Sequence, residues 1–143
     1  VVTGDGELDE GSNWEGLMTI RHYNLTNCIT IVDRNHCMID GNTEDVMKLE
    51  PLADKFVAFG FHTIVCEGNN IVSLCKAIDE AHKTKDKPTV IVADTIKGVG
   101  IKLTSGNYKW HYGAIDEEMA KVAAKDLDEY SAERIARCGK EFE

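Results

Sequence analysis

Short runs of apolar, often β-branched residues alternate along the chain with longer segments that carry the signals of helices. Residues 28–32 and 89–93 are continuous apolar runs, as strands buried on both faces of a parallel sheet are. Pro51 stands near the start of one helical segment, and Gly60 directly follows its end. The pattern predicts strands at 1–3, 28–32, 62–66 and 89–93, and helices at 12–23, 51–59, 71–82 and 116–127.

Polar residues mark two of these helix starts. Ser12 is followed three residues later by Glu15, which is the spacing of a capping box. Asp116 precedes a segment rich in Ala and Lys and is expected to cap it. We therefore expect Ser12 to open the first helix and Asp116 to open the last.

The alternation of strands and helices predicts an α/β fold, with a parallel sheet and helices on both of its faces. Ligands in such sheets bind at the carboxyl ends of the strands. Three polar loops leave predicted carboxyl ends, at 4–10, 33–40 and 95–111. The segment from 95 to 115 has little periodicity, and a stretch of about 20 residues of that kind is either functional or disordered. We expect the three loops to lie together at one edge of the sheet.

Composition and charge narrow the classes of function. The chain has 143 residues, enough for one domain, and no apolar run approaches the roughly 20 residues of a membrane span. Its net charge is −9, and its scattered basic residues do not form the basic face that nucleic acid binding requires. Five cysteines without a closely spaced pair favour a reduced, cytoplasmic compartment. Neither an initiator Met nor a signal peptide is present, which indicates a processed, split or fragmentary chain.

The first candidate chemistry lies at the start of the chain. Asp5 stands between two glycines, which let the backbone turn sharply and let a ligand approach closely. Asn35 follows the next predicted strand, so its amide oxygen and the Asp5 carboxylate can converge at neighbouring strand ends. Such oxygen ligands suit a hard cation such as Mg²⁺. Taken separately, each motif is also the sequence of an ordinary turn.

Together, the two motifs resemble the diphosphate-anchoring motif of thiamine-diphosphate enzymes, and most closely the transketolase family. The segments GDGELDEGSNWEG and ITIVDRNHCMIDG look like the two signature segments of that family. The order of later elements agrees to about Leu127, so the resemblance covers roughly nine-tenths of the chain. It implies a partial thiamine-diphosphate-binding domain at 1–127, followed by a charged tail or helix at 128–143. Family members often carry two acidic residues before the Asn, where this chain has Asp33 and Arg34.

The resemblance implies thiamine diphosphate as the cofactor, with Mg²⁺ as the metal or Ca²⁺ or Mn²⁺ in its place. It implies that the side chains of Asp5 and Asn35 bind the metal. Cys37 would add its main-chain carbonyl, which leaves its thiol incidental. The residues expected against the cofactor are Gly4, Asp5, Gly6, Glu7, Asn35 and His111.

Two glutamates match acidic positions that transketolases place at their dimer interface. By the resemblance, Glu10 and Glu15 would share protons there with facing carboxylates and link two active sites, which makes them catalytic candidates. From the residues alone, both are also explained as a solvated, acidic helix start that the helix dipole favours.

His111 lies in the long loop after the last predicted strand, between Trp110 and Tyr112. It resembles a transketolase histidine beside the reactive carbon of the cofactor, where an imidazole can exchange protons with the substrate hydroxyl. A lone loop histidine is otherwise a surface residue. Upstream, residues 97–100 resemble a Lys-Gly-x-Gly segment of the family, although a glycine turn with a solvated Lys97 explains them as well.

The family also has parts that this sequence lacks, namely the pyrimidine-binding domain with its activating glutamate and a Gly-rich segment ahead of Gly4. The sequence therefore predicts part of an enzyme that transfers a two-carbon ketol unit between phosphosugars. Its expected partners are the remaining transketolase chains, in a hetero-oligomer built on a dimer, and the chain alone is expected to be inactive. The alternatives are another thiamine-diphosphate enzyme, similar to deoxyxylulose-phosphate synthase or a 2-oxo acid dehydrogenase, and a non-catalytic assembly subunit.

Overall fold

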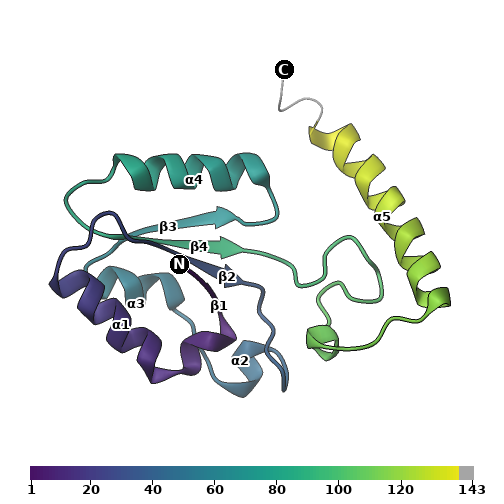
Figure 1. Cartoon of the computed structure of the whole chain (residues 1–143), viewed down its shortest axis with the longest axis horizontal. Coiled ribbons are helices and arrows are strands. Elements are labelled where there is room, and N and C mark those ends of the chain that lie inside the picture. The colour runs from purple at the N-terminus through teal and green to yellow at the C-terminus, as the bar shows by residue number, and fades with distance from the viewer. Residues whose placement is uncertain (139–143) are drawn as a thin grey trace.

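The fold is built on a four-stranded sheet in the order β1-β2-β4-β3, with every neighbouring pair parallel. It is seen in a computed structural model that describes residues 1–138 (Figure 1). All four strands lie within two residues of the predicted bounds, so the parallel α/β prediction is confirmed. The strands are β1 (Val2–Gly4), β2 (Ile29–Arg34), β3 (His62–Glu67) and β4 (Thr89–Asp94).

Helices cover both faces of this sheet, as predicted. In Figure 1, α1 (Gly11–His22) and α3 (Leu52–Ala58) lie below the sheet, and α4 (Ile71–Lys83) lies above it. The short helix α2 (Thr43–Val46) and the 3₁₀ turns η1 (Gly6–Asp9) and η2 (Tyr108–His111) belong to loops at the carboxyl ends of the strands. The last helix, α5 (Glu117–Cys138), lies beyond the end of β4. None of the helices that the structure describes is both long and apolar enough to cross a bilayer.

The larger core lies between the sheet and the two lower helices. Val32 and Val90 of the sheet and Phe56 of α3 are completely buried, and Trp14 of α1 stacks on Phe56 with 5.6 Å between ring centroids. Burial of each such side chain stabilises the fold by about 1.5 to 3 kcal/mol. This packing fixes α1, and with it the loop that precedes α1, against the strands.

The cover of the upper face becomes thinner toward β1. Ala77 and Ala81 let α4 approach Ile91 of β4, which is fully buried. Ile31 of β2 lies beside Ile91 in register and is only half-buried, and Val2 of β1 lies beside Ile31 and is 70% exposed. Within the described residues, β1 is therefore an edge strand whose upper face carries an uncovered apolar side chain.

Two expectations about helix ends require correction. The helix α1 begins at Gly11 after Glu10, and no side chain caps it, so the predicted capping box of Ser12 and Glu15 does not form. The turn η1 ends immediately before α1, and Asn13 donates to the carbonyls of both Glu7 and Glu10, which starts the helix earlier. At the other end of the chain, α5 continues past Leu127 to Cys138 without a break. Residues 139–143 of the predicted tail lie outside the described residues.

Other helix ends agree with the sequence. The carboxylate of Asp116 accepts the N–H of Met119 at 2.8 Å, as a capping residue does. Gly60 follows α3 with a φ of 89°, a left-handed conformation that favours glycine. These two residues fix the directions in which the chain enters α5 and leaves α3.

Candidate functional site

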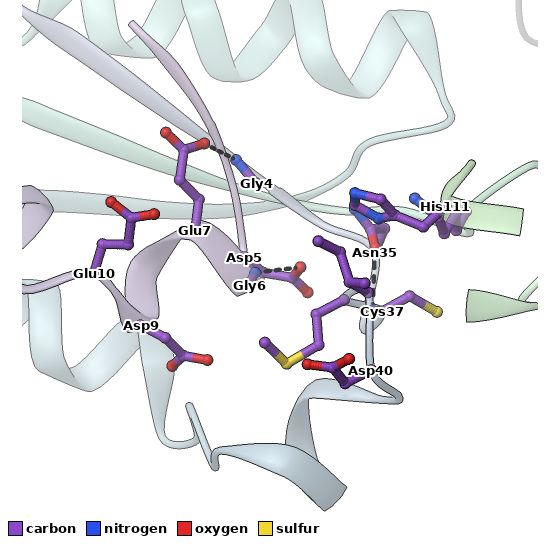
Figure 2. Close-up of a pocket in the computed structure, with 13 residues that line it drawn as sticks. Gly4, Asp5, Gly6, Glu7, Asp9, Glu10, Asn35, Cys37, Asp40 and His111 are labelled. Atoms are coloured by element: carbon purple, nitrogen blue, oxygen red, sulfur yellow. Dashed lines mark hydrogen bonds between the residues drawn. The ribbon is translucent and has the colours of Figure 1, made fainter. Parts of the chain in front are cut away.

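A cavity of about 530 Å³ opens at the carboxyl ends of β1 and β2 (Figure 2). The three loops that the sequence singled out all contribute to it. They bring together every residue expected at the cofactor and the metal. The lining residues are Gly4, Asp5, Gly6, Glu7, Asp9, Glu10, Asn35, Cys37, Met38, Ile39, Asp40, Lys97 and His111.

Asp5 is completely buried at the floor of this cavity, and three donors hold its carboxylate. Its Oδ1 accepts the N–H of Gly6 at 2.8 Å. Its Oδ2 accepts the N–H of His36 at 2.7 Å and an Nη1–H of Arg34 at 2.9 Å. A carboxylate removed from water requires such donors, and together they fix its orientation.

The Arg34 side chain, which contacts Asp5, is only 3% exposed. Besides Asp5, it donates to the hydroxyl of Thr43 at 2.6 Å, to Glu44 at 2.9 Å and to Glu50 at 3.0 and 3.3 Å. Burial disfavours the charge of Arg34, but hydrogen bonds to Asp5 and Glu50 outweigh it and raise the pKa of the guanidinium. The pKa of Glu50 is lowered, first by the N–H of Leu52 and then by Arg34. Sequence reasoning missed this network, and its only signal was an arginine where the transketolase pattern has an acid.

Asn35 and Cys37 lie on a sharp turn directly after β2. Oδ1 of Asn35 accepts the N–H of Cys37 at 3.1 Å, while the amide nitrogen of Asn35 donates to Asp33 at 3.2 Å. His36, between them, has a left-handed φ of 63°. The turn therefore holds the Asn35 amide and the backbone of Cys37 next to each other at the cavity wall.

The oxygen atoms available at this wall suit a hard divalent cation as ligands. A carboxylate from Asp5, an amide oxygen from Asn35 and a main-chain carbonyl are the oxygen ligands that Mg²⁺ accepts, with water and phosphate completing the set. Burial raises the pKa of the Cys37 thiol, which keeps it protonated and a poor ligand. Across the part of the chain that the structure describes, no group of three His, Cys, Asp or Glu side chains is arranged to hold a metal ion. The candidate cation site itself offers only one such side chain, Asp5, beside an amide and a carbonyl oxygen.

The backbone around Gly6 forms a floor without a side chain. A Cβ atom at Gly6 would lie 2.8 Å from Cβ of Met38, closer than real contacts allow. The Glu7 carboxylate is turned back and accepts the N–H of Gly4 at 3.0 Å (Figure 2). An anionic group at this floor would therefore meet the backbone of residues 6 and 7 rather than the Glu7 carboxylate.

The long loop after β4 is ordered by its own hydrogen bonds. Gly106 donates its N–H to the carbonyl of Lys97 at 2.8 Å, and Thr104 donates its hydroxyl to the carbonyl of Gly98 at 2.8 Å. Gly98 and Gly100 have φ values of 62° and 96°, so this turn requires glycine. The loop thereby presents Lys97 to the cavity.

His111 lies on η2, on the side of the cavity opposite Glu10 (Figure 2). Its ring is exposed and meets that of Tyr112 edge to face, with 6.5 Å between centroids. An exposed imidazole at the cavity wall is placed to exchange a proton with a bound molecule.

The two glutamates expected at a dimer interface do not share one environment. Glu10 lines the cavity, whereas Glu15 lies on α1, is exposed and is not part of the lining. The structure thus brings Glu10 to the candidate site and leaves Glu15 outside it. Their role at an interface remains a prediction.

Comparison with known proteins agrees with this geometry. Residues 1–132 match the family described as the transketolase, thiamine diphosphate binding domain. The chain is 39% identical over 127 residues to one of the apulose-4-phosphate transketolase subunits of Actinobacillus succinogenes. It is 37% identical over 131 residues to a 6-deoxy-6-sulfo-D-fructose transketolase subunit of a Clostridium species. These alignments cover 89% and 92% of the chain but 46% and 48% of the relatives, so the chain spans about half of their length.

Among solved structures, the transketolase of Campylobacter jejuni superposes on 89% of this chain with a TM-score of 0.81. The sequence identity in that alignment is 30%, and the alignment covers 20% of the Campylobacter chain. The similarity therefore extends to a partial domain of a much longer enzyme.

Proposed function

The chain belongs to the transketolase family, in its thiamine diphosphate-binding domain, and from this premise we propose that it forms part of an enzyme that transfers a two-carbon ketol unit between phosphosugars. The observation that carries the proposal is the single cavity that Asp5, Gly6, Asn35 and His111 line together. The ketol transfer is supported by relatives that are named as transketolase subunits, and the phosphosugar class by the one that is named for apulose-4-phosphate.

In this proposal, the chain binds the diphosphate end of the cofactor together with a divalent cation. Bound thiamine diphosphate supplies the nucleophilic carbon that carries the ketol unit. Asp5 and Asn35 hold the cation through side-chain oxygens and Cys37 through its carbonyl, while the backbone at Gly6 accommodates the diphosphate. The cavity is rich in carboxylates, so an anionic diphosphate requires a cation between itself and Asp5. Mg²⁺ suits this role, and Ca²⁺ or Mn²⁺ could replace it.

His111 is proposed to act on the substrate and not on the cofactor diphosphate. Its imidazole, on the side of the cavity opposite Glu10, would move a proton to or from the substrate hydroxyl. Lys97 contributes positive charge to the lining and suits a phosphate or hydroxyl of the sugar. The metal ligands and the proton-transfer group would thus come from different loops.

The partner is proposed to be the remaining transketolase chain or chains, docked along β1. A groove of about 140 Å³ runs between β1 and α1, lined by residues that include Val1, Thr3 and Gly16. Within the described residues, the buried hydroxyl of Thr3 has no hydrogen-bond partner. An edge strand beside an apolar groove suits a packed protein segment, and such a segment could also supply a partner for this hydroxyl. A cytoplasmic hetero-oligomer built on a dimer is the proposed assembly.

The test is to purify the protein from its source with the chains that accompany it. We expect the assembly to bind thiamine diphosphate only with a divalent cation and to transfer a ketol unit between phosphosugars. Turnover of 2-oxo acids, or formation of deoxyxylulose phosphate, would instead favour one of the other thiamine-diphosphate enzymes. Cofactor binding without any turnover would favour a non-catalytic role in the assembly.

A further inference from the structure

Arg34 connects the two sides of the proposed cation site. It holds the Asp5 carboxylate, which belongs to the loop after β1, and it directly precedes Asn35 at the end of β2. The contact between Arg34 and Asp5 therefore sets the separation of the two side chains that are proposed to bind the cation. The other two donors to Asp5 are backbone N–H groups of residues 6 and 36.

We propose that Arg34 is a positioning residue, which fixes the Asp5 carboxylate in the orientation that a divalent cation requires before the cation arrives. This inference rests on the proposed function, because it concerns the cation that accompanies thiamine diphosphate. Arg34 does not touch the cation or the cofactor and acts only through Asp5.

The guanidinium is itself fixed on its far side. Its five N–H groups are directed to four residues, in contacts of 2.6 to 3.3 Å. Thr43, which receives one of them, is completely buried, and Glu44 and Glu50 complete the set from the segment around α2. A lysine carries three donors on one atom and cannot reproduce this planar arrangement. Charge at position 34 is therefore not sufficient for the role.

The positive charge of Arg34 also opposes cation binding, because it repels a cation beside Asp5. Glu44 and Glu50 lie against the guanidinium and offset that charge. Loss of Arg34 thus has two opposed consequences for Mg²⁺, a worse orientation of Asp5 and a weaker repulsion. The sign of the measured change identifies which of them dominates.

The experiment measures the Mg²⁺ concentration that half-saturates thiamine diphosphate binding, by calorimetry on the assembled enzyme with its partner chains. For both Arg34→Gln and Arg34→Lys, we expect this concentration to rise about tenfold or more, the range typical of residues that orient metal ligands. Turnover at saturating Mg²⁺ and cofactor should stay within about twofold, because the chemistry itself is untouched. A purely structural role would lower the melting temperature without this selective, Mg²⁺-reversible loss.

Two further variants serve as controls. Arg21→Gln, on α1 and outside the cavity lining, removes an arginine that donates to Asn24 and should change the Mg²⁺ requirement less than twofold. Thr43→Val removes one acceptor of Nη1 and should raise the Mg²⁺ requirement by a few-fold, which keeps the proposal testable if the Arg34 variants do not fold.

An unchanged or lower Mg²⁺ requirement in both folded Arg34 variants overturns the proposal. A wild-type Mg²⁺ requirement in Arg34→Lys overturns it as well, even if Arg34→Gln requires more Mg²⁺. If the Arg34 variants do not fold, an unchanged requirement in Thr43→Val overturns it. A wild-type assembly that binds no thiamine diphosphate with Mg²⁺ would refute the proposed function instead, so the two failures are distinguishable.

Discussion

Asp5 and Cys37 both line the cavity, but they are expected to offer a cation different atoms. Asp5 offers a charged side chain, so Asp5→Ala should abolish metal-dependent binding of thiamine diphosphate to the assembled enzyme. Cys37 should offer only its carbonyl, so Cys37→Ser should bind the cofactor almost normally. Calorimetry with Mg²⁺ and thiamine diphosphate tests both expectations.

Asp5→Ala also leaves the buried Arg34 without one of its carboxylates, which can destabilise the fold by about 3 to 5 kcal/mol. Asp5→Asn keeps the shape of the side chain and is therefore measured beside Asp5→Ala. Circular dichroism shows whether each variant is folded. A large loss of affinity in folded Cys37→Ser would contradict the backbone assignment.

His111 is expected to act after the cofactor has bound. His111→Ala should leave the affinity for thiamine diphosphate within a few-fold and should lower turnover by about 100-fold or more, as the loss of a general acid or base does. Steady-state kinetics and calorimetry on the same preparation separate the two quantities. His82→Ala, at an exposed position in the last turn of α4, is the matched control. Parallel loss of cofactor and turnover, or full turnover, would make His111 a packing or surface residue.

At the residue scale, the sequence predicted the lining of the cavity but not what lies under it. Asp5, Asn35 and His111 follow strands or lie in a loop that leaves one, and parallel strands bring such positions together. The partners of Arg34 stand 10 and 16 positions downstream, at Glu44 and Glu50, and only the tertiary fold brings them to it. An arginine at the end of an apolar run otherwise indicates a strand that reaches solvent.

At the scale of the element, α5 is held by a carboxylate near its middle. Asp126 is buried and accepts the N–H of Lys102 at 2.9 Å, and this hydrogen bond, ahead of the Lys102 ammonium, lowers the pKa of Asp126. Because the folded pKa lies below the unfolded value of about 3.9, the stabilisation is present above that value. It is lost as the pH falls through the folded pKa.

We therefore expect Asp126→Asn to lower the melting temperature of the chain at pH 7. The difference from the wild-type chain should shrink as the pH falls below about 4, which thermal melts followed by circular dichroism measure. Glu129→Gln, at a more exposed position on the same helix, should have a smaller effect at pH 7. A difference that stays constant from pH 7 to pH 3 would contradict the assignment.

Element types were more predictable than element ends. Periodicity and β-branched runs report burial, which decides whether a segment is a strand or a helix. The start of α1 depends instead on η1, whose Glu7 carbonyl accepts a hydrogen bond from the Asn13 side chain, and the capping signal at Ser12 is thereby overridden. The sequence left 128–143 as a charged tail or helix. Its weak amphipathic pattern did not indicate that the helix expected to end near Leu127 continues without a break to Cys138.

At the scale of the molecule, the parallel sheet with helices on both faces followed from the alternation of elements. The order of the strands could not be predicted in this way. The strand β4 lies between β2 and β3, and only packing determines that position.

The first molecular prediction is that the purified chain alone transfers no ketol unit. Its three loops line one cavity, and the activating glutamate and the Gly-rich segment that the family resemblance implies are expected to come from the partner chains. A coupled assay with phosphosugars, cofactor and Mg²⁺ measures this, with the assembled enzyme as the positive control. Ketol transfer by the chain alone, free of host enzyme, would refute the prediction.

The second molecular prediction concerns the uncovered edge of the sheet. Val2→Glu should leave the melting temperature of the isolated chain nearly unchanged, because Val2 is 70% exposed there, and should prevent association with the partner chains. Ile71→Glu is the matched control, since Ile71 is 73% exposed but lies at the start of α4. Native mass spectrometry of the mixed chains measures association. Normal assembly of the Val2 variant would show that β1 is not the docking edge.

The proposed cation ligand Asp5 follows directly on β1, an edge strand of the described sheet with an exposed apolar side chain at Val2. A partner that packs against β1 restricts the motion of the Asp5 loop, and a cation bound to Asp5 restricts β1 in turn. Binding energies coupled in this way are reciprocal, so each ligand must tighten the other by the same factor. Thiamine diphosphate with Mg²⁺ should then act as an assembly factor, and the concentration of partner chains should set the apparent affinity for the vitamin-derived cofactor.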